Sequence, residues 1–252
     1  MTLVVPAWAG DVVAGIGRPV AFTTVSGAHL YGFPSADSDV DIRGVHVLGV
    51  REVIGLRTGP ATLTRAGVRD GVELDVVTHD LAKFARLMLK PNGYVLEQLL
   101  SPLVITTSDL HAELRALAPA CVTRGHLRHY EGFARGQWEL FERSGELKPL
   151  LYTFRVLLTG VHLMRTGELE ADLRRLTGGP PYLPELIAAK REREHGNAAG
   201  LVAPDRLAKD VAALRSELDD AAAASTLPLE LPADTEAAMD RLVIEGRLTS
   251  GG

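Results

Sequence analysis

Apolar and polar residues alternate in three short segments near the start of the chain, at residues 20–25, 40–47 and 72–78. Alternation with a period of two, in runs rich in Val and Thr, is typical of a strand that buries one face. The segment 55–71 between the second and third runs is rich in Gly, Thr and Arg, which predicts a hairpin or loop region. The first hundred residues are therefore expected to contain a sheet.

The spacing changes from strand-like to helical after the third run. Apolar residues recur at i, i+3, i+4 and i+7 in the segment 81–88, which predicts an amphipathic helix with Thr78 or Asp80 as its N-cap. A second short helix is expected from Tyr94 to Leu100, with Asn92 as its candidate cap.

Beyond about residue 108 the strand signals disappear and only helical periodicity remains. It recurs in the segments 110–118, 127–141, 147–165, 203–218 and 235–246. Aromatic residues at positions 130, 133, 138 and 141 predict a buried stripe on the second of these helices. The pattern divides the chain into a sheet-containing domain, residues 1–107, and a helical domain, residues 108–252.

Candidate chemistry is concentrated on the second expected strand. Asp39 and Asp41 are two residues apart, so they share one face with Cα atoms roughly 7 Å apart. Two like charges in this arrangement repel each other unless a cation lies between them. Gly27, upstream, allows the backbone to approach a phosphate closely. These features favour metal-dependent phosphoryl or nucleotidyl transfer, with Glu73 or Asp75 on the third strand as a further carboxylate.

Composition narrows the class of protein. The chain has 252 residues, 46% of them apolar and 23% charged, as in ordinary soluble proteins. Its net charge of −5 argues against a long nucleic-acid duplex as partner. A single cysteine, Cys121, excludes an internal disulfide and is expected to be a buried apolar residue. Without a long apolar run or a signal-like N-terminus, a cytoplasmic location with no membrane contact is expected.

A known family matches this arrangement. Gly27, followed twelve residues later by Asp39-Val40-Asp41, resembles the signature of the DNA polymerase beta-like nucleotidyltransferase superfamily. The longer string 28–45 looks like a branch of uncharacterised bacterial predicted nucleotidyltransferases. Further similarity to that branch lies at 81–84, 90–92, 97–102, Lys148 and 153–155. The resemblance covers roughly residues 20–170.

The resemblance implies an α+β fold, in which a nucleotidyltransferase-type mixed sheet with flanking helices is followed by a C-terminal helical bundle. It also implies a catalytic site with two Mg²⁺ ions, or Mn²⁺, held by Asp39, Asp41 and a third carboxylate. Asp75 fits the pattern of the branch better than Glu73, which stays an alternative.

The resemblance further implies a binding site for a nucleoside triphosphate. The turn at Gly27-Ala28 would hold the β- and γ-phosphates, while Lys148 and Arg155 would close on the triphosphate from the helical domain. The superfamily has serine directly after the first glycine, but this chain has Ala28 there and a serine, Ser26, before the glycine. A hydroxyl contact worth about 1 kcal/mol is thus missing.

Several of these residues have ordinary structural roles as alternatives. Ser38 is expected either to form a turn or to contact phosphate. Arg43 can form a salt bridge with the acids, face solvent or bind phosphate. Lys148 and Arg155, two helical turns apart, can equally belong to a solvated helix face.

The expected function is an enzymatic one: transfer of a nucleoside monophosphate from a nucleoside triphosphate, by default AMP from ATP, to a hydroxyl acceptor, with release of pyrophosphate. The acceptor is left open between a protein, an RNA 3′ end and a small molecule, and so is the oligomeric state. One alternative, favoured by Ala28, is a catalytically weak nucleotide-binding module with a regulatory or antitoxin-like role that acts through its helical domain. Another is a metal-dependent phosphohydrolase, which would release phosphate instead.

Overall fold

The structure, a computed structural model, describes residues 5–192 and 196–250. The described chain forms two compact units. The first contains residues 5–30, 39–121 and 231–250, and the second contains residues 31–38, 122–192 and 196–230. The helices α6 (Asp109–Cys121) and α11 (Thr235–Ser250) belong to the first unit. The domain boundary between residues 107 and 108 stays a prediction.

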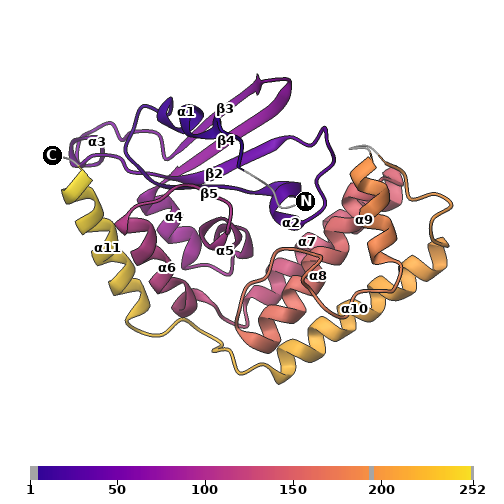
Figure 1. The fold of residues 1–252 in the computed structure, drawn as a ribbon. Helices are drawn as coiled ribbons and strands as arrows, with labels where there is room; N and C mark the ends of the chain where they lie inside the picture. Colours follow the sequence, from indigo (N-terminus) through magenta and orange to yellow (C-terminus); the bar gives the residue numbers. More distant parts are fainter. Residues whose placement is uncertain (1–4, 193–195, 251–252) are drawn as a thin grey trace. The chain divides into compact units, whose positions relative to one another are not determined.

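The first unit is built on a five-stranded sheet (Figure 1). In spatial order its strands are β3 (Thr62–Arg69), β4 (Val72–Asp80), β2 (Val40–His46), β1 (Val20–Val25) and β5 (Val104–Thr106). The pair β2–β4 is parallel and the other pairs are antiparallel, so the sheet is mixed. The three predicted strands are confirmed, and the expected hairpin region supplies β3, which turns into β4 at Asp70-Gly71.

Helices cover both faces of this sheet (Figure 1). On one face, α1 (Ala9–Ala14) packs against alternate apolar residues of the central strands, including Ile42 and Val76. On the other face, the ring of Phe22 from β1 lies 5.5 Å from that of Phe84. The strands β1 and β2 are therefore covered on both faces, whereas their period-two alternation predicted the burial of one face only.

Local capping sets where the helices of this second face begin. Asp80 accepts a hydrogen bond from the N–H of Ala82 and caps α4 (Leu81–Met88). Asn92 accepts one from the N–H of Tyr94 and caps α5 (Gly93–Leu100). Both predicted helices are confirmed, and Asp80, not Thr78, is the cap of the first.

The C-terminal helix α11 is fastened to the same unit by an ion pair. Arg247 Nη2 lies 2.7 Å from Oδ2 of Asp80, with side-chain exposures of only 11% and 6%. Nη1 of Arg247 also donates to the carbonyl oxygen of Leu48. Cys121, at the end of α6, is buried as expected, and burial raises the pKa of its thiol to about 11. The two contacts of Arg247 thus hold α11 against the residues that precede α3 (Val50–Val53) and α4.

Helices make up most of the second unit. They are α7 (His126–Ser144), α8 (Leu147–Thr166), α9 (Leu183–Glu192) and α10 (Pro204–Ala224). The central helix α8 is buried on nearly all sides, as expected for a helix that is apolar around its circumference. The predicted aromatic stripe on α7 is only partly buried, because Tyr130 is inaccessible but Phe133 is 37% exposed.

The α+β class predicted from the sequence, a mixed sheet with flanking helices followed by C-terminal helices, is confirmed. Within the described residues, no helix is long and apolar enough to cross a membrane.

Candidate active site

Two carboxylates meet on adjacent parallel strands. The pairing of β2 with β4 sets Asp41 opposite Asp75. Neighbouring strands are about 4.8 Å apart, so the two side chains stand side by side on the same face. Glu73 is exposed and lies two residues earlier on β4, outside the β2 pairing. Asp75, not Glu73, is therefore the neighbour of Asp41 across the strands, while the choice of Asp75 as third ligand stays a prediction.

Arg43 lies between these two carboxylates. Its Nη2 donates to Oδ1 of Asp41 at 2.6 Å and to Oδ2 of Asp75 at 2.8 Å. Nη1 donates to the backbone carbonyl of Asp75, and Nε donates to the hydroxyl of Tyr94 at 3.0 Å. Burial opposes the positive charge, but Tyr94, Asp41 and Asp75 together raise the pKa of Arg43 above its ordinary value. Of the roles considered for Arg43, the structure contains the salt bridge.

The glycine turn lies against the same carboxylate. The N–H of Ser26 donates to the backbone carbonyl of Asp41 at 2.8 Å. Gly27 has a φ of +64°, and a Cβ at this position would overlap Oδ2 of Asp41. The turn continues into a short helix, α2 (Gly27–Tyr31), which contains the buried Ala28. Only glycine fits here, for reasons of both backbone conformation and space.

Ser26 has a buried hydroxyl next to this turn. Its side chain is 1% exposed, and its Oγ has no hydrogen-bond partner among the described residues. A buried polar atom without a partner is destabilising, and a bound ligand or water can supply the missing hydrogen bond. The hydroxyl of Ser26 is thus available at the turn where the superfamily serine is replaced by Ala28.

Asp39 lies one residue before β2 and is half-buried. In the part of the chain that the structure describes, no three His, Cys, Asp or Glu side chains form a group suited to hold a metal ion. Asp41 and Asp75 are paired through Arg43 instead. The ligand set of Asp39, Asp41 and Asp75 stays a prediction.

The donor chemistry of the site nevertheless fits a hard divalent cation. Carboxylate oxygens are the ligands that Mg²⁺ and Mn²⁺ prefer, and strand register brings two of them together. Gly27 leaves the space that Asp41 occupies, and the unpartnered hydroxyl of Ser26 is beside it in sequence. Asp41 and Asp75, with Asp39 just before β2, are the residues that would hold such an ion.

The second unit contains the other predicted phosphate ligands. Lys148 and Arg155 lie on one continuous helix, α8, as expected. Arg155 is not part of a solvated face: it is 2% exposed, and its guanidinium carbon lies 3.8 Å from the ring centroid of Tyr31. Lys148 is half-buried in the first turn of α8.

Ser38 has a partner that the sequence did not indicate. Its hydroxyl and that of Ser35 are 2.9 Å apart, and both receive hydrogen bonds from Nζ of the fully buried Lys190 on α9. Lys190 could not be found in the sequence, because no motif marked it and α9 was not predicted. These bonds fix the segment that leads into Asp39, which agrees with the structural role considered for Ser38.

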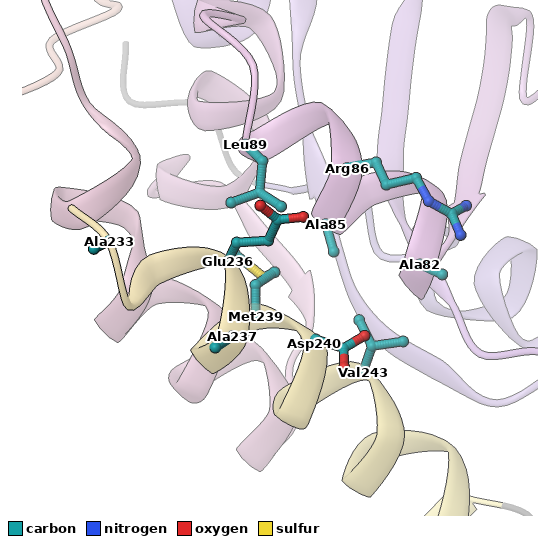
Figure 2. A pocket seen from close by; sticks show the side chains of 10 residues that line it. All are labelled: Ala82, Ala85, Arg86, Leu89, Ala233, Glu236, Ala237, Met239, Asp240 and Val243. Carbon is teal, nitrogen blue, oxygen red and sulfur yellow. The ribbon is translucent and has the colours of Figure 1, made fainter. Parts of the chain in front are cut away.

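A separate pocket of about 480 Å³ lies between α4 and α11 in the first unit (Figure 2). Leu89 and Met239 form part of its apolar lining, and Arg86, Glu236 and Asp240 are its charged residues. None of the predicted site residues lines it, so it is distinct from the pair of carboxylates.

Comparison with known proteins shows the family to which the chain belongs. Residues 11–245 match a family described as the RNA repair pathway DNA polymerase beta family. The protein is therefore a nucleotidyltransferase of the DNA polymerase beta-like superfamily, as the motif predicted. Within that superfamily, the chain belongs to the RlaP family.

Two individual proteins are also similar to this chain. The uncharacterised protein MJ0002 of Methanocaldococcus jannaschii is 33% identical over 153 residues, which cover 60% of this chain and 63% of the relative. The match thus spans less than two thirds of that protein. The crystal structure of a nucleotidyltransferase-like protein from Exiguobacterium sibiricum aligns with 97% of this chain and 74% of its own, at 11% identity and a TM-score of 0.31. That similarity is too low to support a conclusion by itself.

Proposed function

We propose that this nucleotidyltransferase moves AMP from ATP to a hydroxyl acceptor and releases pyrophosphate. The observation that carries the proposal is the pairing of Asp41 with Asp75 across β2 and β4, directly against the glycine turn. If the two carboxylates had only a structural role, the turn would not need to pack so closely on Asp41 that only glycine fits at position 27. Together with membership of the RlaP family, this arrangement supports nucleotidyl transfer.

Each carboxylate has its own part in the proposed reaction. The acceptor oxygen attacks the α-phosphorus of ATP, the bond to the bridging oxygen of the β-phosphate breaks, and pyrophosphate leaves. Asp39, Asp41 and Asp75 would hold the divalent cation, and Asp75 also assists removal of the acceptor proton. The cation, Mg²⁺ or Mn²⁺, would stabilise the negative charge of the triphosphate when it is bound.

The triphosphate ligands belong to the same proposal. The backbone of Gly27 and Ala28 would hold the terminal phosphates, and the buried hydroxyl of Ser26 is placed to replace the missing serine at position 28. Arg43 is a further candidate phosphate ligand. For Ser38, Lys148 and Arg155, the support is the resemblance of their positions to those of the branch.

For the acceptor, we propose the 3′-hydroxyl of an RNA. The family description places relatives of this chain in RNA repair, which favours RNA over a protein or a small molecule. The net charge of −5 favours a short RNA end over a long duplex. A cytoplasmic location is part of this proposal.

The test is transfer of label from each α-labelled NTP to an RNA oligonucleotide with a free 3′-hydroxyl, in the presence of Mg²⁺ or Mn²⁺. Asp41→Asn and Asp75→Asn are each expected to lower the rate by about 10³-fold or more, because a neutral amide is a poor substitute for a metal-binding carboxylate. Asp37→Asn is the matched control, because Asp37 lies four residues before Asp41 but is exposed.

The possible outcomes separate the candidate functions. Full transfer by the double variant Asp41→Asn/Asp75→Asn would refute the proposed site. Label on a protein or a small molecule, but not on RNA, would change the acceptor only. Nucleotide binding without transfer under any condition would favour the regulatory module, for which Ala28 is the supporting observation. Release of phosphate instead of pyrophosphate would favour a phosphohydrolase.

A further inference from the structure

Arg43 makes more polar contacts than a surface arginine needs. Its guanidinium bonds to both carboxylates, to the carbonyl oxygens of Ile42 and Asp75, and to Tyr94. Its side chain is only 11% exposed, against 20% for Asp41 and 39% for Asp75. The guanidinium is therefore held from several sides at the centre of the pair.

The carboxylates need a positive charge between them. On adjacent parallel strands their repulsion would otherwise separate the side chains. Nη2 of Arg43 supplies that charge, and it does so at the facing oxygens, Oδ1 of Asp41 and Oδ2 of Asp75. These are the oxygens through which the two residues can share one ligand.

A divalent cation and this guanidinium cannot use the same oxygens at once. Mg²⁺ binds carboxylate oxygens at about 2.1 Å, and Nη2 of Arg43 already lies within 2.8 Å of both oxygens. Two cations within such a distance would repel each other strongly. Binding of the metal through these two oxygens therefore requires that Arg43 leave the pair.

We propose that Arg43 is an internal counter-ion that competes with the divalent cation for Asp41 and Asp75. It keeps the carboxylates together before the metal arrives, and it lowers the apparent affinity for the metal by the free energy needed to release it. Tyr94 is the second point that holds it in place, through Nε. This inference rests on the proposed function, because the cation is the one that nucleotidyl transfer would use.

The experiment is a titration with Mn²⁺ alone, without nucleotide, followed by electron paramagnetic resonance of free Mn²⁺ or by calorimetry. Arg43→Gln removes the positive charge but keeps most of the length of the side chain. It is expected to bind Mn²⁺ at least about tenfold more tightly than the unsubstituted protein. Arg69→Gln is the matched control, because Arg69 is an exposed arginine on β3, and its affinity for Mn²⁺ should not change.

A second variant keeps the test independent of folding. Tyr94→Phe removes only the hydroxyl that accepts from Nε of Arg43, on a side chain that is 39% exposed. It should weaken the hold on Arg43 and raise the affinity for Mn²⁺ by about two- to fivefold. Unchanged or weaker binding in a folded Arg43→Gln protein would overturn the proposal, and so would unchanged binding in Tyr94→Phe if Arg43→Gln does not fold.

The location of the ion is tested with Asp41→Asn. If this variant binds Mn²⁺ as well as the unsubstituted protein, the ion lies elsewhere and the competition does not exist. The titration tests the counter-ion and the transfer assay tests the proposed function, so either proposal can be refuted without the other. Transfer with no effect of Arg43 on Mn²⁺ binding would refute the counter-ion alone, whereas competition without transfer on any acceptor would refute the proposed function.

Discussion

Gly27→Ala should disable the proposed site without unfolding the protein. A Cβ at Gly27 would overlap Oδ2 of Asp41 and lie 3.1 Å from its Cγ, so the carboxylate must move by about 1 Å to reach ordinary contact. A displacement of about 1 Å at reacting groups typically lowers a rate by about 10²-fold. The left-handed backbone, with φ at +64°, adds a strain of about 1–2 kcal/mol.

The measurements are the initial rate of label transfer and the free energy of unfolding in urea. The matched control is Gly71→Ala in the β3–β4 turn, where φ is +79° but no atom lies within 4 Å of the added Cβ. Both variants should lose about 1–2 kcal/mol of stability, and only Gly27→Ala should lose the rate. A full rate in Gly27→Ala, or an equal loss of rate in both variants, would show that the contact with Asp41 does not matter.

Two further predictions concern stability. Arg247→Met should lower the free energy of unfolding by about 3–5 kcal/mol in a urea titration, because it leaves the buried Asp80 without its charged partner. Arg165→Met, in the exposed pair with Glu217, is the control and should cost less than about 1 kcal/mol in the same titration. Burial lowers the pKa of His126 to about 4, from 6.5. Between these values the unfolded chain binds more protons, so stability should fall as the pH is lowered from 6.5 to 4, and His126→Gln should flatten that slope. Equal slopes in both proteins would contradict the assignment to His126.

Local pattern was sufficient for the elements that carry the site. Alternation identified β1, β2 and β4, and helical spacing with a polar cap identified α4 and α5, because these signals depend on neighbours within about four residues. The turn at Gly27 and the segment 37–41, which contains the aspartates, are also local patterns, so they could be identified from the sequence. No helix was predicted over α9, although its buried residues Leu183, Leu186, Ile187 and Lys190 follow helical spacing, one of them being a lysine. The mostly exposed β3 has no clear apolar face and was expected only as part of a hairpin or loop region.

The partners within the site were not visible in the same way. Asp41 and Asp75 are 34 positions apart, and only the register of β2 against β4 makes them neighbours. The sequence left Glu73 and Asp75 open because both lie on the same face of one strand. A shift of the register by two residues would exchange them without changing the alternation.

Local pattern alone indicated the kind of chemistry, because Asp39, just before the second strand, and Asp41, on it, follow a glycine turn in the signature of the superfamily. The way in which those charges are balanced follows from the packing of the fold instead. Arg43 bridges Asp41 and Asp75, and its contact with Asp75 spans 32 positions. Lys190 binds the two serines before Asp39 across more than 150 positions. Such contacts depend on the packing of whole elements, which no local pattern encodes.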